Sequence, residues 1–174
     1  MRRMMVGMLM AAIAAAGCGK RAEQAAAEPA SVPEAFVSEK PAGEPIPIPE
    51  ARALESGTDV VLQGRVMGVR APFVDGRAVF VLGDTGTINP CTDDHCSIPW
   101  DACCDPPDVR AAGTVTIQVL DEGGEVLAQS VKGLHGLKEL SRVTVAGTVA
   151  QNSSAESFVV NATSLYVDPG NTRK

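Results

Sequence analysis

The sequence predicts an all-β fold, a five-stranded Greek-key barrel with one short helix, preceded by a disordered tether. Three observations predict it. Five segments alternate apolar and polar residues with the period of a β-strand, and glycine-, asparagine- or aspartate-containing turns separate several of them. An Ala-, Glu- and Pro-rich stretch with few large apolar residues comes before them. A segment crowded with cysteine and aspartate interrupts the strands after the second one.

The first 17 residues predict export from the cytoplasm. Arg2 and Arg3 precede an apolar run over 4–16, and small residues follow, as in a secretory signal. The run is too short to span a bilayer, which needs about 20 residues. The sequence AAGC at 15–18 resembles the lipobox of bacterial lipoproteins, although alanine stands where that family usually has leucine. The resemblance implies cleavage before Cys18 and lipidation of its thiol; the alternative is an ordinary secreted protein with an odd cysteine.

The residue after the lipobox indicates which of two bacterial membranes would hold the lipid anchor. Gly19, not aspartate, follows Cys18, which in bacteria with two membranes favours the periplasmic face of the outer membrane over the inner membrane. Residues 18–49 are then a lipid-anchored linker, and the membrane is the first predicted partner. Their composition cannot bury enough apolar surface to offset the entropy of ordering, and the alternating prolines of 41–50 predict an extended chain.

One folded domain is predicted over residues 50–170, and residues 171–174 are predicted to be a disordered tail. One or two helical turns over 49–58 open the domain, because Pro49 suits a first helical turn and Gly57 suits its end.

Two strands follow these helical turns. The long β-branched segment 58–70 predicts the first strand, and Gly64 and Gly68 indicate bulges or sharp bends within it. Residues 77–84 predict the second strand, joined to the first through the Asp-Gly turn at 75–76.

Three strands and a short helix complete the pattern. Residues 113–121 alternate cleanly, so their alternate side chains share one face of a strand. A short helix or turn over 133–142 comes next. The segments 142–151 and 157–168 then predict an antiparallel pair around the polar residues at 152–154.

Three strands, a short helix and two strands, in that order, are the order of an OB-fold barrel. The GRV of the first strand, the FVLGD of the second and the V-x-V-x-G-x-V of the fourth resemble bacterial OB-fold domains related to anticodon-binding modules, over about residues 58–168. This resemblance implies a fold and no catalytic residues. The PWDACC sequence at 99–104 is similar to a segment of predicted bacterial lipoproteins with no assigned activity.

The cysteine-rich loop over 84–112 carries four cysteines, Cys91, Cys96, Cys103 and Cys104. An even number of cysteines in an exported domain predicts disulfides, here two. Adjacent side chains of an extended chain point to opposite sides, so Cys103 and Cys104 should take different partners. The predicted pairs are either Cys91–Cys103 with Cys96–Cys104 or Cys91–Cys104 with Cys96–Cys103.

A metal site is the alternative use of this loop. Cys91, Cys96, Cys103 and Cys104 with His95 could hold zinc or copper(I). However, the spacing Cys-x4-Cys-x6-Cys-Cys is not the paired Cys-x2-Cys of zinc ribbons, and adjacent ligands cannot easily reach one tetrahedral ion. The prediction is therefore disulfides, without a metal or other cofactor.

Four further residues of the loop are candidate contacts for an envelope protein or small ligand: Trp100, Asp93, Asp94 and Asp101. Trp100 contacts a partner if it is exposed, and otherwise packs over the disulfides in a small satellite core. The aspartates lack the spacing of an EF-hand calcium loop, so a solvated acidic surface is the simpler interpretation.

The net charge of the chain disfavours nucleic-acid binding, and the absence of catalytic motifs disfavours an enzyme. With 21 acidic against 15 basic residues and a net charge of −6, the chain repels polyanions, which disfavours nucleic acid as a partner. The sequence has no Gly-x-Ser-x-Gly, His-Glu-x-x-His or phosphate-binding glycine loop, so no enzyme is predicted. The leading hypothesis is a membrane-anchored, extracytoplasmic OB-fold lipoprotein that binds or scaffolds. Its alternatives are a metal-handling lipoprotein and a nucleic-acid-binding OB-fold.

Overall fold

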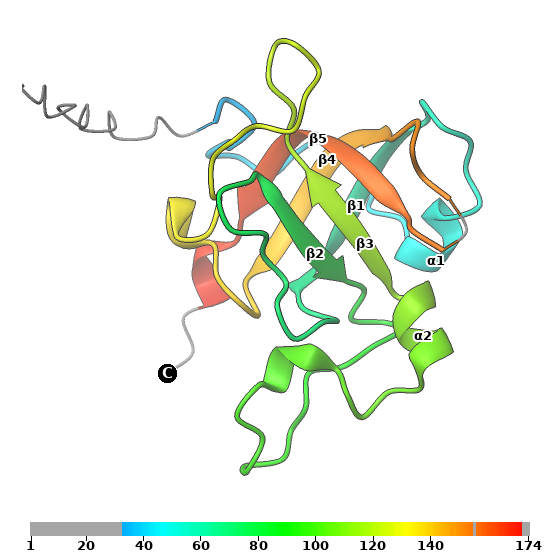
Figure 1. The fold of residues 1–174 in the computed structure, drawn as a ribbon, viewed down its shortest axis with the longest axis vertical. Coiled ribbons are helices and arrows are strands. Elements are labelled where there is room, and N and C mark those ends of the chain that lie inside the picture. The colour runs from blue at the N-terminus through cyan, green and yellow to red at the C-terminus, as the bar shows by residue number, and fades with distance from the viewer. Residues whose placement is uncertain (1–32, 155, 172–174) are drawn as a thin grey trace, which may run out of the picture.

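The structure is a computed structural model that describes residues 33–154 and 156–171. These residues are mostly β: a closed five-stranded barrel with only two short α-helices (Figure 1). The strands are β1 (Asp59–Val66), β2 (Val79–Gly83), β3 (Thr114–Gln118), β4 (Arg142–Val149) and β5 (Val159–Val167). The helices are α1 (Ile48–Ala51) and α2 (Pro107–Ala112), and the single 3-10 turns are η1 (Pro99–Asp101), η2 (Leu134–Gly136) and η3 (Pro169–Asn171).

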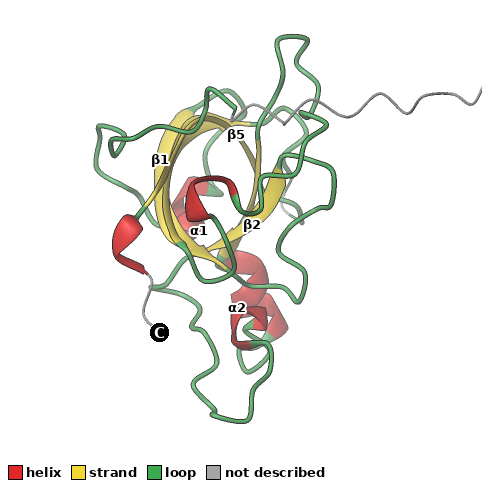
Figure 2. Ribbon diagram, turned by 90° about the vertical axis from the view of Figure 1, so that its left-hand side faces the viewer, coloured by secondary structure: helices red, strands yellow, loops and turns green. Residues whose placement is uncertain are grey.

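The barrel closes through the order β1-β2-β3-β5-β4, with β4 pairing back onto β1 (Figure 2). Neighbouring strands are antiparallel except β3 and β5, which run parallel. Each of the five predicted strands is present, somewhat shorter than predicted. All five end within the predicted segments because pairing, unlike local propensity, stops where the neighbouring strand departs.

Side chains from all five strands fill the core inside the barrel. On β3 the burial alternates strictly, and Val115 and Ile117 point inward with 1% and 0% exposure. Phe80 of β2 and Phe158, just before β5, are also buried, as their apolar surroundings in the sequence predict. The single-face alternation predicted for residues 113–121 is therefore confirmed.

Two glycines of the first predicted strand behave differently from one another. Gly64 continues the regular β1–β4 register opposite Val143, so it forms no bulge. It is needed for a close approach, because a Cβ there would overlap the carbonyl oxygen of Gly83. Gly68 lies just after β1 with φ +109°, and it makes the predicted bend.

Residues 33–49, which the sequence assigns to the linker, lie against the barrel. The N–H of Val37 donates to the carbonyl oxygen of Leu165 at 3.0 Å, and the N–H of Ile46 donates to that of Val61 at 3.0 Å. Phe36 is 9% exposed and Ile48 is fully buried in the main core. The predicted boundary at residue 50 is therefore too late, because isolated apolar residues anchor a proline-rich segment whose average composition is polar.

The helices differ most from prediction. Between β3 and β4, where the sequence predicts a short helix or turn, the chain forms the 3-10 turn η2, in which His135 has φ 48° and breaks the helical path. Helix α2 was not predicted, and it lies inside the cysteine-rich loop, where Pro107 opens its first turn. The helical turns predicted over 49–58 are present as α1, which is shorter and begins one residue earlier.

Candidate functional site: the cysteine-rich loop

The cysteine-rich loop connects β2 to β3 and projects beyond the end of the barrel, at the bottom of Figure 1. Its two ends are held together, because the N–H of Asp84 donates to the carbonyl oxygen of Gly113 at 2.8 Å. The Asp84 carboxylate also accepts a hydrogen bond from the backbone N–H of Gly86 at 2.8 Å. The loop therefore leaves the barrel from a fixed base.

A small apolar cluster packs the middle of the loop against the segments after β1 and before β4. Met67, Ile88 and Ala102 are fully buried together, and Trp100, Val109 and Leu140 pack against them. This cluster is separate from the main core of the barrel.

Trp100 belongs to this cluster and is half-buried. Its indole N–H donates to the carbonyl oxygen of Arg70 at 3.0 Å, and its own carbonyl oxygen accepts from the N–H of Gly68 at 2.8 Å. Trp100 thus ties the loop to the segment after β1. The cluster that Trp100 joins is made of Met67, Ile88 and Ala102, so its predicted packing over disulfides stays a prediction.

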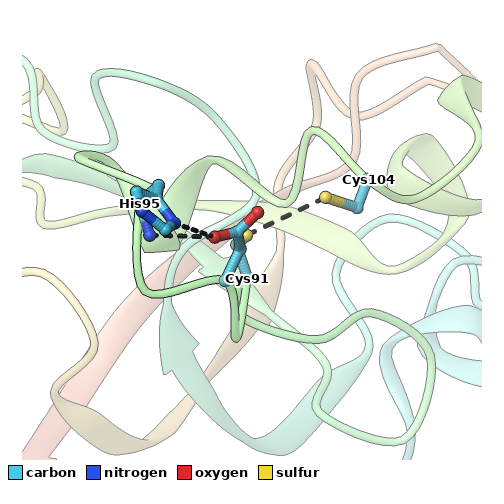
Figure 3. Close-up of polar contacts among 4 residues, drawn as sticks. Cys91, His95 and Cys104 are labelled. Atoms are coloured by element: carbon cyan, nitrogen blue, oxygen red, sulfur yellow. Dashed lines mark hydrogen bonds and ion pairs between the residues drawn. The ribbon is translucent and has the colours of Figure 1, made fainter.

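The four cysteines of the loop differ in exposure. Cys91 and Cys96 are half-buried, whereas Cys103 and Cys104 are exposed. The thiol of Cys104 donates to the sulfur of Cys91 across 3.9 Å (Figure 3). No two of these sulfurs are at bonding distance, so the predicted disulfides stay a prediction.

The geometry corrects one step of the disulfide argument. Cys103 and Cys104 do not lie in an extended chain but in a turn, which the hydrogen bond from Asp105 N–H to the Ala102 carbonyl closes at 3.1 Å. Ala102 begins this turn with φ 52°, a conformation that alanine rarely adopts. The alternation of side chains along a strand therefore does not apply to this pair of cysteines.

The thiols influence one another's ionisation. A hydrogen bond from the backbone N–H of Asp93 lowers the pKa of the Cys91 thiol, and the thiols of Cys96 and Cys104 add to the effect. The hydrogen bond to Cys91 and its charge, followed by the charge of Cys103, raise the pKa of Cys104 to about 11. The pKa of Cys91 is therefore lowered and the pKa of Cys104 is raised, which favours Cys91 as the thiolate of these two.

Opposing effects act on the pKa of Cys96. A hydrogen bond from the backbone N–H of Ile98 lowers its pKa, but the Cys91 side chain, burial and the charges of Cys91 and Cys103 together outweigh it, and the pKa of Cys96 is raised. The proton therefore stays on Cys96 while Cys91 ionises.

The proposed extra metal ligand, His95, interacts with an aspartate. Its Nδ1 lies 3.3 Å from Oδ1 of Asp93, and its backbone N–H donates to the same oxygen at 2.8 Å (Figure 3). Its side chain is 97% exposed. Within residues 33–154 and 156–171, no three His, Cys, Asp or Glu side chains are arranged to hold a metal ion.

The candidate contact aspartates are placed differently from one another. Asp93 and Asp94 are exposed on the outer part of the loop, whereas Asp101 is half-buried in η1. The predicted signal sequence and Cys18 lie outside the described residues. In the part of the chain that the structure describes, no helix is long and apolar enough to cross a membrane.

Sequence reasoning missed a second feature, a small hollow of about 130 Å³ on the outer side of the barrel. It lies among Val81 of β2, Thr116 of β3 and the segment before β5. The guanidinium of Arg52 lies 5.6 Å from the centre of the Phe158 ring at this hollow, and burial lowers the pKa of Arg52. Phe158 is the core residue that the sequence predicts, and nothing local in the sequence connects it to Arg52.

Comparison with models of known protein families found no match, and comparison with curated proteins found no similar sequence.

Proposed function

We propose that this chain is a lipid-anchored envelope protein with an OB-fold barrel, and that its cysteine-rich loop is the contact surface for a protein partner. The single observation that carries the proposal is the projection of an acidic loop from a closed barrel, fixed at its base and by its own small core (Figure 1). Such a loop presents a shaped surface at little additional ordering cost on binding.

The strand order supports the OB-fold. A closed barrel with the order β1-β2-β3-β5-β4 agrees with five strands that run three, then a connection, then two. One departure is the connection itself, where a single 3-10 turn, η2, stands in place of the expected helix.

The lipobox-like sequence at 15–18 supports anchoring through Cys18. A lipid anchor gains about 0.8 kcal/mol for each buried CH₂, so several acyl chains on one residue would hold the domain at the membrane. The residue after Cys18 is glycine, which favours the periplasmic face of the outer membrane.

Charge indicates the kind of partner. Between Asp84 and Asp108 there is no Lys or Arg, and Asp93 and Asp94 lie exposed on the outer part of the loop. An acidic projection is complementary to a basic protein surface and repels nucleic acid. The proposed partner is therefore an envelope protein with a Lys- or Arg-rich face.

Site-specific photo-crosslinking in intact cells tests this contact. A photo-reactive residue at Asp94 should give one discrete crosslinked product, whereas the same residue at Glu122, an exposed acidic position in the turn after β3, should not. Asp93→Asn in the Asp94-labelled chain should weaken the product. Equal crosslinking from both positions, or no product from Asp94, would contradict the proposal.

Fractionation tests the anchor separately. Cys18→Ser should move the chain from the membrane fraction to an unprocessed or soluble form. A variant that still fractionates as an acylated protein would show that Cys18 is not the lipidation site.

A metal-handling function is the second candidate, because the thiols of Cys91, Cys96, Cys103 and Cys104 influence one another and the first and last are in contact. Soft thiolates prefer zinc or copper(I). Metal analysis of protein purified from its native compartment separates the two functions, since only the second requires a stoichiometric ion.

A further inference from the structure

Two thiols of the cysteine-rich loop are already in contact, although 13 residues separate them in sequence. The Sγ atoms of Cys91 and Cys104 are 3.9 Å apart, with Cys104 as the donor (Figure 3). Bonded sulfurs are about 2.0 Å apart, so a small movement of side chains in an exposed turn would bring them together.

The backbone holds these two thiols in place independently of any bond between them. The N–H of Cys91 donates to the carbonyl oxygen of Pro99 at 2.8 Å, and the N–H of Asn89 donates to Oδ2 of Asp105 at 3.2 Å. Both hydrogen bonds join the segment that contains Asn89 and Cys91 to residues 99–105, which include Cys104. The effective concentration of one thiol near the other is therefore set by the fold.

The contact also has a direction. The thiol of Cys104 donates to the sulfur of Cys91, so the two sulfurs already face each other. Only a thiolate attacks a disulfide, so one of these two thiols ionises and attacks first, and the other follows.

We propose that Cys91 and Cys104 form the first disulfide of the loop, and that Cys96 and Cys103 are left as the second pair. This assignment selects one of the two pairings that the sequence leaves open. It does not depend on the lipid anchor or on the partner of the loop.

The oxidant is an external disulfide, either of a small thiol or of an oxidoreductase. One thiol of the pair ionises, and its thiolate attacks one sulfur of that disulfide, forms a mixed disulfide and releases the other sulfur as a thiolate. The second thiol of the pair then loses its proton, attacks the loop sulfur of the mixed disulfide and releases the second thiolate. Two thiols of the loop thus supply two electrons, and one external disulfide becomes two thiols.

Two-cysteine variants test the pairing in the full-length chain, with Cys18→Ser as background so that only two thiols remain. Cys96→Ser with Cys103→Ser keeps the proposed pair. Cys96→Ser with Cys104→Ser is the matched control, which keeps Cys91 and Cys103. Each is equilibrated in reduced and oxidised glutathione, alkylated and weighed by mass spectrometry.

The variant that keeps Cys91 and Cys104 should stay oxidised under more reducing conditions than the control. We expect a difference of about tenfold in the equilibrium constant, which is about 30 mV in reduction potential for a two-electron couple. Equal constants, or a more stable disulfide in the control, would overturn the assignment. A variant that keeps only Cys103 and Cys104 and oxidises most readily would overturn it as well.

The chain with all four loop cysteines gives an independent readout. Trypsin leaves the four in one peptide, because no Lys or Arg lies between Arg77 and Arg110. Cleavage at aspartate, followed by partial reduction and fragmentation, distinguishes the neighbours Cys103 and Cys104. A Cys91–Cys104 linkage supports the assignment, whereas a Cys91–Cys103 linkage, or four free thiols with a bound stoichiometric metal, rejects it.

Discussion

The carboxylate of Asp84, just after β2, accepts a hydrogen bond from the backbone N–H of Ile48, at the start of α1, across 3.1 Å. The two residues are 36 positions apart, Asp84 is only 9% exposed and Ile48 is fully buried. The other oxygen of the same carboxylate accepts from the N–H of Gly86. One side chain therefore joins the N-terminal segment to the base of the cysteine-rich loop.

Removing this carboxylate should destabilise the domain. Asp84→Ala leaves the buried N–H of Ile48 without its acceptor, which should lower the free energy of unfolding by about 1–3 kcal/mol. Asp84→Asn keeps one acceptor oxygen and should cost less. Urea unfolding followed by circular dichroism measures both. The matched control is Asp75→Ala, in an exposed turn, which should change stability by less than about 0.5 kcal/mol; an equal loss in this control would show that Asp84 has no special role.

A charge inside the barrel should be far more damaging. Val145 of β4 is fully buried in the main core, so Val145→Asp places an unpaired carboxylate among apolar side chains. We expect a loss of about 4 kcal/mol or more, or failure to fold. Val74→Asp, at a position 46% exposed, should leave the melting temperature almost unchanged. If the Val145 variant melted like the wild type, the inward face of β4 would have to be reassigned.

The third prediction tests whether residues 33–49 belong to the folded domain. Phe36 is buried and its ring stacks on that of His135, with centroids 5.6 Å apart. Phe36→Ala should therefore cost about 2–4 kcal/mol, somewhat less than a central core phenylalanine because the site is at the edge. Glu39→Ala, in the exposed part of the same segment, is the control. Thermal melts in which both variants match the wild type would return residues 33–49 to the linker.

The strands could be predicted from sequence because their information is local. Alternation of apolar residues along 113–121 or 142–151 determines both the period and the buried face, whatever the rest of the chain does. The role of Gly64 could not be predicted, because it depends on the carbonyl of Gly83 in another strand. Docking of Phe36 beside Leu165 was hidden for the same reason, since composition averages over the few residues that make the contact.

The candidate site was predicted in its residues but not in its geometry. The number of cysteines and the acidic composition of the loop are visible in sequence, and so is the isolated Trp100. The turn at Cys103 and Cys104 is not, because it requires a positive φ at Ala102, which local preference disfavours. Burial of Ala102 against Met67 and Ile88 supplies the long-range contacts that hold this conformation.

The last prediction concerns the reduced loop and follows from the raised pKa of Cys104. The thiolate is the form that reacts with an alkylating reagent, so at pH 9 Cys104, with its pKa of about 11, should react slowly while Cys91, with its lowered pKa, reacts fast. Alkylation of Cys104 should rise steeply only as the pH approaches 11. Time-resolved labelling of the reduced chain, with cleavage at aspartate and fragmentation of the peptides to distinguish Cys103 from Cys104, gives both rates.

Two variants test which neighbouring thiol raises the pKa of Cys104. The hydrogen bond and charge of Cys91 are the largest contributions to the Cys104 shift, so Cys91→Ala should lower the pKa of Cys104 and speed its alkylation at pH 9, by about tenfold for each unit that the pKa falls. Cys96→Ala removes a thiol that does not contribute to the Cys104 shift and should leave its rate nearly unchanged. If the two variants accelerated Cys104 equally, or if neither did, the contact between Cys91 and Cys104 would not be what governs this thiol.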